Sequence, residues 1–298
     1  MHTHKVNGEF NKPLILPVYL NTLIVNGKFN QPIILPNNIK DLYIYGEFNQ
    51  PIILPKNIKN FLINGKFNQS IILPERLNSL CICGKFNQPL VLPNTLKDLK
   101  IDGEFNQPLI ISPNLYQLEI NGVFNKPIII PNSIRFLSIF GVFNKTINIH
   151  NIIYLEIGGK FNQPIILPFY LSGLELYSDS FKQSIILPDN LNYLRIKYKY
   201  NQPIILSDNL EDLEISGEFN QPIVLSDNLL NLKISGEFNQ PIVLSDNLST
   251  LEISGVFNQP LVLSDNLIDI KISGVFNQPL IFPDSIVNIQ INDDKNMI

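Results

Sequence analysis

The stretch Phe48–Lys66, FNQPIILPKNIKNFLINGK, decides the fold of this chain, because Phe67–Lys85 repeats its pattern at a spacing of nineteen residues. A ring residue opens every copy of the unit. These ring residues are Phe10, Phe29, Phe48, Phe67, Phe86, Phe105, Phe124, Phe143, Phe161, Phe181, Tyr200, Phe219, Phe238, Phe257 and Phe276. Only the steps from Phe143 to Phe161 and from Phe161 to Phe181 differ, with eighteen and twenty residues. Such a period is typical of a solenoid, in which each repeat forms one coil.

Each part of the unit predicts a local structure. A Leu-x-Ile pair, such as Leu99 and Ile101, alternates as a short half-buried strand does, and indicates one parallel strand per coil. The glycine that follows, such as Gly103, lets the chain turn out of the sheet. The proline after the ring residue, such as Pro108, excludes a helix and a central strand, so the return path is predicted to be extended.

The ring residue and the asparagine after it predict how the coils stack. Stacked phenylalanines form a continuous aromatic spine. An amide such as that of Asn49 or Asn106 can bond turn backbone, which predicts an asparagine ladder. Nineteen residues are too few for a strand, two turns and an ordinary helix. We therefore predict a mainly β fold with little or no α-helix: a single curved solenoid of about fifteen coils, with a parallel sheet on the concave face and an extended, proline-bearing convex side.

The repeats leave little chain outside the array. They occupy approximately residues 8–292, between short polar tails at 1–7 and 293–298. No linker or change of composition interrupts them. We predict one repeat domain over residues 1–298.

The composition narrows the partner classes. The formal net charge is -4 at pH 7, which favours neither nucleic acid nor an anionic membrane surface. The chain contains 2 cysteines, too few for a disulfide framework. We expect no signal peptide and no transmembrane segment, and hence an intracellular protein, in the host cytoplasm if the chain is viral.

The motif G-x-F-N-Q-P-I, followed by L-P-x-N-L-x-x-L-x-I, resembles the FNIP repeat of social amoebae and giant DNA viruses. It occurs as GEFNQPI at Gly46, Gly217 and Gly236, and as GKFNQPL at Gly84. The resemblance implies a short relative of the leucine-rich repeat. Phe181-Lys182 and Tyr200 depart from the motif, beside the irregular stretch YSDSFKQS, which predicts a bulge or loop within the region 177–200.

The same resemblance bears on function. Many members of the family carry an F-box ahead of the repeats, which implies recruitment of substrates to a ubiquitin ligase. The repeats of this sequence begin within its first ten residues, so we expect no F-box and do not transfer the adaptor role directly.

The solvent face of the predicted sheet holds the candidate partner-binding residues. Apolar side chains gather on its N-terminal part: Tyr43, Tyr45, Leu62, Cys81 and Cys83, with Phe136 and Phe140 further along. A contiguous apolar patch often marks an interface. The alternative is that the N-terminal tail or self-association covers the patch.

The C-terminal part of the same surface alternates in charge. Arg195, Glu214, Lys233, Glu252 and Lys271 occupy one strand position in successive copies and form a possible charge ladder. The favoured interpretation is that opposite neighbours stabilise and solubilise the sheet. An electrostatic docking strip is the alternative.

The sequence offers no convincing catalytic, cofactor or metal site. His2 and His4 form a His-x-His pair without further ligands. Cys81 and Cys83 lack a second cysteine pair for zinc, and as same-face neighbours on a strand they are predicted to be poorly placed for a disulfide. Acidic residues recur with the repeat and converge nowhere. We expect a non-enzymatic protein without cofactors.

Three functional hypotheses remain. The leading one is a protein-binding scaffold that uses the sheet face, because the surface positions vary between copies while the frame does not. The second is a structural or self-assembling component, because the ends lack capping sequences and leave sheet edges open. The third, implied by the resemblance, is a substrate-recruiting partner related to F-box adaptors. The protein partner is unknown.

Overall fold

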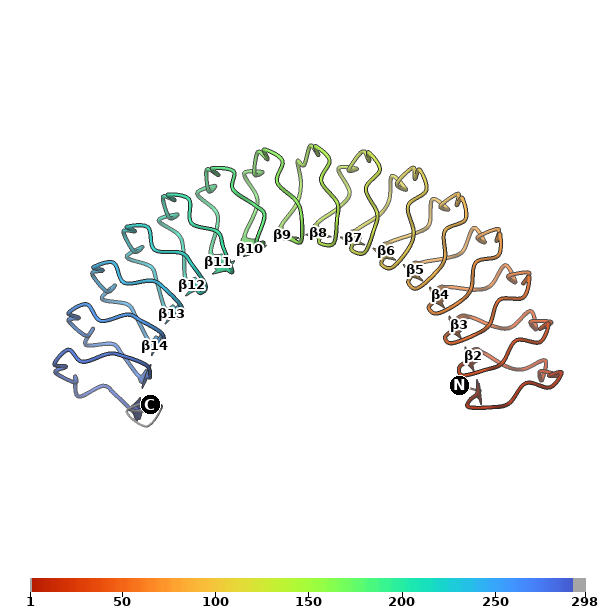
Figure 1. Cartoon of the computed structure of the whole chain (residues 1–298), viewed down its shortest axis with the longest axis horizontal. Helices are drawn as coiled ribbons and strands as arrows, with labels where there is room; N and C mark the ends of the chain where they lie inside the picture. The colour runs from red at the N-terminus through yellow and green to blue at the C-terminus, as the bar shows by residue number, and fades with distance from the viewer. Residues whose placement is uncertain (1, 292–298) are drawn as a thin grey trace. The chain divides into compact units, whose positions relative to one another are not determined.

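The computed structural model describes residues 2–291, and they form two compact units that are divided between Asn148 and Ile149. Each unit is a stack of coils in which strands line one side and extended return segments line the other (Figure 1). Residues 2–291 contain strands and turns but no helix. The predicted all-sheet parallel solenoid is therefore confirmed, while the assignment of one repeat domain to residues 1–298 stays a prediction.

The first unit contains eight short strands. They are β1 (Thr3–Val6), β2 (Thr22–Val25), β3 (Asp41–Ile44), β4 (Asn60–Ile63), β5 (Ser79–Ile82), β6 (Asp98–Ile101), β7 (Gln117–Ile120) and β8 (Phe136–Ile139). Each strand pairs in parallel with the next strand along the chain. Since the repeat length is constant here, identical positions of successive repeats lie side by side.

The second unit is built in the same way. Its strands are β9 (Tyr154–Gly158), β10 (Gly173–Tyr177), β11 (Tyr193–Lys197), β12 (Asp212–Ile215), β13 (Asn231–Ile234), β14 (Thr250–Ile253), β15 (Asp269–Ile272) and β16 (Asn288–Ile291). They also pair in parallel and in chain order. The twenty-residue step keeps this register, because Leu174 still pairs with Leu194.

The core of each coil is a layer of inward leucine and isoleucine side chains with one ring behind it. In the first unit, neighbouring ring centroids from Phe10 to Phe143 are 6.0 to 6.2 Å apart. Strands of a sheet lie roughly 4.8 Å apart. The coils are thus closer together at the sheet than at the rings, so each unit curves with its sheet on the inner side.

The glycine turn permits the close stacking of coils. Gly46 has a φ of 76°, a left-handed conformation that favours glycine. A Cβ at Gly46 would overlap the carbonyl oxygen of Gly27. The same carbonyl accepts a hydrogen bond of 2.9 Å from the amide of Glu47, so a side chain at Gly46 would disturb a bond between coils.

Asparagine side chains bond the coils on the other side of the ring. The amide nitrogen of Asn49 donates to Oδ1 of Asn30 at 2.8 Å, and the amide of Asn68 donates to Oδ1 of Asn49 in turn. Because each side chain accepts from the backbone of the following coil, the bonds connect coil to coil rather than residues within one coil.

The irregular stretch at residues 177–184 contains a bend, which accommodates the one residue by which this repeat is longer than the regular nineteen-residue repeat. Strand β10 is five residues long, and Tyr177 is its last residue. Ser178 is buried, and its hydroxyl donates to the carbonyl of Gly159 at 3.0 Å while accepting from the amide of Phe181 at 2.9 Å. A side chain here makes the bond to the preceding coil that backbone amides make in regular coils.

Candidate binding surface on the sheet

The solvent face of the sheet carries the residues that alternate with the core. In β3, Leu42 and Ile44 are buried, whereas Asp41 and Tyr43 are partly exposed. Across the first unit, the middle face position forms one column of paired residues. That column is Lys5, Ile24, Tyr43, Leu62, Cys81, Lys100, Glu119 and Ser138.

An uninterrupted apolar run occupies this column from β2 to β5. Ile24, Tyr43, Leu62 and Cys81 are each partly exposed and lie on four consecutive strands. We call these four residues the apolar stripe. Burial, and secondarily the negative charge of Asp41, raise the pKa of Tyr43, so its phenol stays neutral. The stripe therefore presents an uncharged surface on four adjacent strands.

Cys81 and Cys83 lie side by side at the edge of the apolar stripe. Their Sγ atoms are 3.3 Å apart, and both thiols are free. The two side chains share a hydrogen bond rather than a disulfide, and the poor placement for a disulfide stays a prediction. The hydrogen bond from Cys81 lowers the pKa of Cys83, and the same bond raises the pKa of Cys81.

Tyr45 directly follows β3 and Cys83 directly follows β5, and both residues flank the apolar stripe. The equivalent position of the intervening coil, after β4, is Asn64. Phe136 and Phe140 do not join the apolar stripe, since both belong to the coil of β8. Phe136 instead packs against Tyr116, with ring centroids 5.4 Å apart.

A charged pair separates the apolar stripe from the rings of Tyr116 and Phe136. The Nζ of Lys100 on β6 lies 2.5 Å from Oε1 of Glu119 on β7. The predicted patch is thus two smaller patches, with an ion pair between them.

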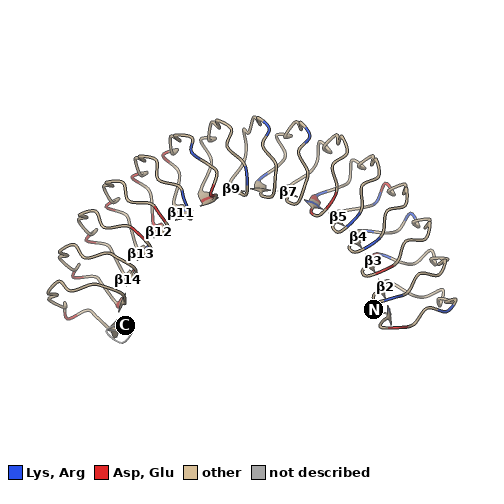
Figure 2. Ribbon diagram, viewed as in Figure 1, with Lys and Arg blue, Asp and Glu red and all other residues tan. Residues whose placement is uncertain are grey.

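The charge ladder of the second unit forms as two groups of ion pairs. Arg195 Nε lies 2.6 Å from Oε2 of Glu214, and Glu252 binds both Lys233, at 3.0 Å, and Lys271, at 3.4 Å. Figure 2 shows the acidic and basic residues along these strands. Burial raises the pKa of Glu252, but the two lysines outweigh that effect and lower it overall. Pairing within the ladder supports its role in stabilising the sheet.

A cluster that the sequence analysis missed lies beside this ladder. Glu175 on β10 is only 4 % exposed, and its carboxylate accepts hydrogen bonds from the hydroxyls of Tyr154 and Tyr177. Arg195 Nη1 lies 3.1 Å from Oε2 of Glu175 and donates to the hydroxyl of Tyr177 at 2.8 Å. We call Tyr154, Glu175, Tyr177 and Arg195 the Glu175 cluster. A buried carboxylate is tolerated here because it is paired and hydrogen-bonded.

Gly173 makes the cluster possible. It stands between Tyr154 and Tyr193 in the first face column, and the two rings lie 6.2 Å apart across it. A Cβ at Gly173 would overlap the ring of Tyr154. The signal in the sequence was a glycine at a strand position that other coils fill with a side chain, between two tyrosines.

Burial also affects the tyrosines of this region. It raises the pKa of Tyr154, with a further contribution from the hydrogen bond to Glu175. Burial and the charge of Glu175 together raise the pKa of Tyr193 to about 12. These phenols therefore stay protonated at neutral pH, and Tyr154 stays a hydrogen-bond donor.

Residues 2–291 lack both a metal-ligand cluster and a membrane-spanning helix. No three His, Cys, Asp or Glu side chains within residues 2–291 gather closely enough to hold a metal ion. No helix in that range is long and apolar enough to cross a membrane. The depression over β11 to β14, lined in part by Tyr193, Arg195 and Glu214, is open and has a volume of about 240 Å³.

Comparison with known families identifies the repeat. Residues 29–66 match the family model of the FNIP repeat. These residues are FNIP repeats. The matched span runs from Phe29 to Lys66, so it contains β3 and β4 in two successive coils. Tyr43 and Leu62 of the apolar stripe thus belong to FNIP repeats. No curated protein sequence matches the chain.

Solved structures share the fold of this chain. CroV588 of the giant virus CroV, described as a novel circular leucine-rich-repeat protein, is 24% identical with a TM-score of 0.66 over 98% of this chain. YopM from Yersinia enterocolitica WA-314 is 19% identical with a TM-score of 0.65 over 95% of this chain. The chain spans 59% of CroV588 and 66% of YopM. The fold is therefore a leucine-rich-repeat-like solenoid.

Proposed function

We propose that the chain is a non-enzymatic scaffold that binds a protein partner on the sheet face of its first unit, with the apolar stripe at the centre of the contact. The observation that carries the proposal is the run of Ile24, Tyr43, Leu62 and Cys81 on four consecutive strands, all partly exposed. Apolar and aromatic side chains in the middle of a polar surface are typical of the core of a protein interface.

The surroundings of the stripe support a bounded site. Lys5 precedes it and Lys100 follows it in the same column. In the flanking column, Asp41 accepts hydrogen bonds from Thr22 at 3.1 Å and from Asn60 at 2.6 Å, so polar groups beside the stripe are already satisfied. An apolar centre with a satisfied polar rim matches the anatomy of protein interfaces. We infer that the partner presents an apolar segment along the column.

The contrast between units also favours this location. At the same strand position, the second unit carries Glu214, Lys233, Glu252 and Lys271, which pair largely with one another or with Arg195. Charged groups already paired within the chain gain little from a partner. The sheet face of the first unit is therefore the better candidate.

A photo-crosslinking experiment tests the proposal. Benzoylphenylalanine replaces Tyr43 in one variant and Asn231, a face residue of β13, in a matched control. In lysate of the source cells, we expect a discrete crosslinked protein from position 43 that unlabelled wild-type chain competes away. A competitor with Leu62→Asp should fail to displace it, provided that its thermal unfolding matches that of wild type. Equal labelling from positions 43 and 231, or competition by the Leu62→Asp chain, would contradict the proposal.

A further inference from the structure

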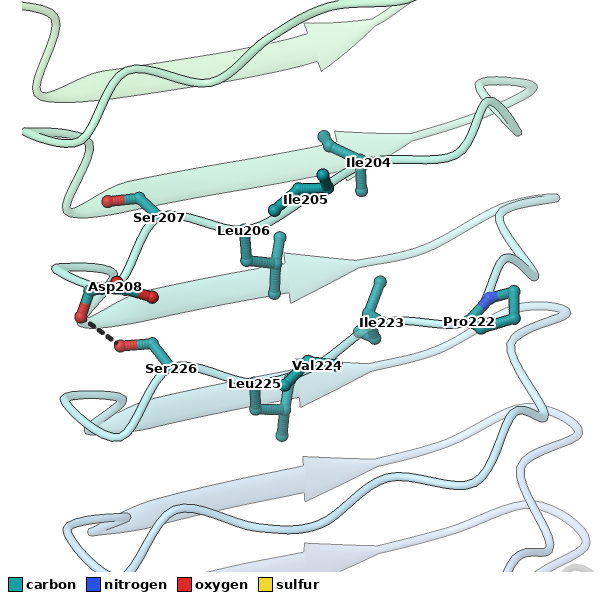
Figure 3. A pocket seen from close by; sticks show the side chains of 10 residues that line it. All are labelled: Ile204, Ile205, Leu206, Ser207, Asp208, Pro222, Ile223, Val224, Leu225 and Ser226. Carbon is teal, nitrogen blue, oxygen red and sulfur yellow. Dashed lines mark hydrogen bonds between the residues drawn. The ribbon is translucent and has the colours of Figure 1, made fainter.

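The turns that precede the strands carry opposite charges in the two units. Each of these turns joins a return segment to a strand, and Figure 3 shows Asp208 in one of them, at the side of the sheet where the strands begin. In the first unit these turns hold exposed cations on four consecutive coils, from the turn before β3 to the turn before β6. We call these residues the basic edge: Lys40, Lys56, Lys59, Arg76 and Lys97.

In the second unit the same turns hold exposed carboxylates on six consecutive coils, from the turn before β11 to the turn before β16. We call these residues the acidic edge: Asp189, Asp208, Asp227, Asp246, Asp265 and Asp284. The turns of the acidic edge contain no lysine or arginine, whereas the turns of the basic edge contain one carboxylate, Glu75. The two edges are therefore oppositely charged surfaces of one chain.

Contacts within the chain neutralise neither edge. No ion pair among residues 2–291 includes a residue of the basic edge or of the acidic edge. The Nζ of Lys97 instead donates to the carbonyl oxygen of Asn114 at 3.2 Å. On the acidic edge, the carbonyl oxygen of Asp208 accepts a hydrogen bond of 2.6 Å from the hydroxyl of Ser226, which holds neighbouring turns together (Figure 3). The carboxylates of adjacent coils thus stand in one line and repel one another.

Both edges lie at the side of a curved unit rather than on its concave or convex face. The strands line the inner side and the return segments the outer side, and the turns join the two (Figure 1). A half-turn about an axis that points from the return segments to the sheet brings two such edges face to face and keeps both sheets on the same side. The curvatures of the two units then match, so contact continues along all the facing coils.

We propose that the basic edge of the first unit binds the acidic edge of the second unit in another copy of this chain. Both edges repeat at the spacing of the coils, so cations on four coils face aspartates on four coils at once. The half-turn makes the two stacks run in opposite directions. The turn of Lys97 therefore faces that of Asp189, and the turn of Lys40 faces that of Asp246. Complementary charges of this kind steer association and select the partner.

Exposed aromatic residues set the register of the two edges. Phe169 and Tyr170 occupy the turn before β10, one coil before the acidic edge, and are 61 % and 67 % exposed. Their rings pack edge to face, with centroids 5.2 Å apart. In this register the pair faces the turn before β7, which contains Pro113 and the half-exposed Tyr116. The contact then has an apolar end beside its charged part, as protein interfaces combine apolar and polar areas.

Charge reversal tests the contact in sedimentation experiments on the nuclease-treated full chain. The basic-edge variant carries Lys40→Glu, Lys59→Glu, Arg76→Glu and Lys97→Glu, and the acidic-edge variant carries Asp189→Lys, Asp208→Lys, Asp227→Lys and Asp246→Lys. We expect wild type to associate at about 100 μM in about 0.05 M salt, and each variant alone to associate at least about tenfold more weakly. An equimolar mixture of the two variants should associate as wild type does, because acidic edges then meet basic edges again.

The matched control has the same net charge as the basic-edge variant but reverses lysines near the ring residues, at the other ends of the strands. It carries Lys12→Glu, Lys85→Glu, Lys126→Glu and Lys160→Glu, and it should associate as wild type does. Circular dichroism and thermal unfolding should show that all three variants are folded. In about 1 M salt, where the Debye length is roughly 3 Å, the association of wild type should weaken.

Three results would overturn the proposal. They are a wild-type chain that stays monomeric in low salt, a mixture of the two variants that associates no better than its components, and association that is unchanged in high salt. Association that requires added nucleic acid would also overturn it, because the basic edge would then bind a polyanion and not a second copy.

Discussion

The ring of Tyr154 lies in the space that a side chain at Gly173 would occupy. From there the Tyr154 hydroxyl reaches Glu175, and the ring stacks with that of Tyr193 two strands away. The absence of a side chain at Gly173 on β10 thus determines where the ring of Tyr154 on β9 lies, and it lets the Tyr154 hydroxyl donate to the carboxylate of Glu175.

Gly173→Ala should therefore destabilise the second unit by about 1–3 kcal/mol, because the new methyl group displaces Tyr154 and weakens its bond to Glu175. Urea denaturation followed by tyrosine fluorescence measures this effect, and the chain contains 0 tryptophans that would mask the signal. In a Tyr154→Ala background the same change should cost much less. An unchanged cost there would show that Tyr154 is not the residue displaced.

Tyr200→Phe should stabilise the protein by about 1 kcal/mol. Tyr200 replaces phenylalanine in the aromatic spine and is 1 % exposed, and its hydroxyl has no hydrogen-bond partner among the described residues. Burial raises its pKa to about 12. The matched change, Tyr154→Phe, removes a hydroxyl that donates to a carboxylate and should cost about 1.5–3 kcal/mol. Shifts of the same sign in the two denaturation midpoints would refute this account.

Tyr198→Gly should stabilise the protein by about 0.5–1 kcal/mol. A residue with a Cβ is strained in the left-handed conformation, and glycine relieves that strain, which is larger than the entropy that glycine loses on folding. Tyr198 has a φ of 62° at a turn position that other coils fill with glycine, and its ring is largely exposed. Gly217→Ala in the next coil is the contrast, because its Cβ would overlap the carbonyl oxygen of Tyr198. Thermal unfolding of both variants should shift in opposite directions.

Lys182→Asn should strengthen the bonds between coils. The amide of Lys182 donates to Oδ1 of Asn162 at 2.9 Å, but lysine has no side-chain acceptor to offer the following coil. Asparagine at this position places an Oδ1 near the amide of Asn201, for a gain of about 0.5–1.5 kcal/mol. Asn106→Ala, which removes the acceptor for the amide of Asn125, should cost about as much or more. Hydrogen exchange of the Asn201 amide reports the new bond directly.

The two cysteines should react with alkylating agents in a fixed order. The hydrogen bond from Cys81 lowers the pKa of Cys83, and this bond also raises the pKa of Cys81. Since the thiolate is the nucleophile, iodoacetamide at about pH 7.5 should modify Cys83 before Cys81. Cys81→Ala removes the donor and should slow alkylation of Cys83 several-fold, as peptide mass spectrometry can measure. Equal alkylation rates at the two thiols of the wild-type chain would argue against a hydrogen bond in which Cys81 is the donor and Cys83 the acceptor.

The apolar stripe was predictable in part. A period of nineteen residues with Leu-x-Ile in each copy placed Tyr43, Leu62 and Cys81 on one face, and the strand register shows them as neighbours. Phe136 and Phe140 were assigned to the same patch, because a list of exposed apolar residues does not show what lies between them. The pairing of Lys100 with Glu119, which separates the two groups, depends on side-chain reach across strands.

By itself the sequence determined the repeat, the parallel coils and the inward Leu-x-Ile frame, because contacts in a solenoid join equivalent positions of adjacent copies and a constant period specifies those positions. Only the tertiary structure decided where a side chain lies when the neighbouring strand has a glycine at the paired position, as for Tyr154, whose ring lies over Gly173. It also decided which residue of each Ile-Ile-Leu run faces water, since three consecutive apolar residues carry no polar alternation from which to predict a face. The Glu175 cluster depends on such a choice.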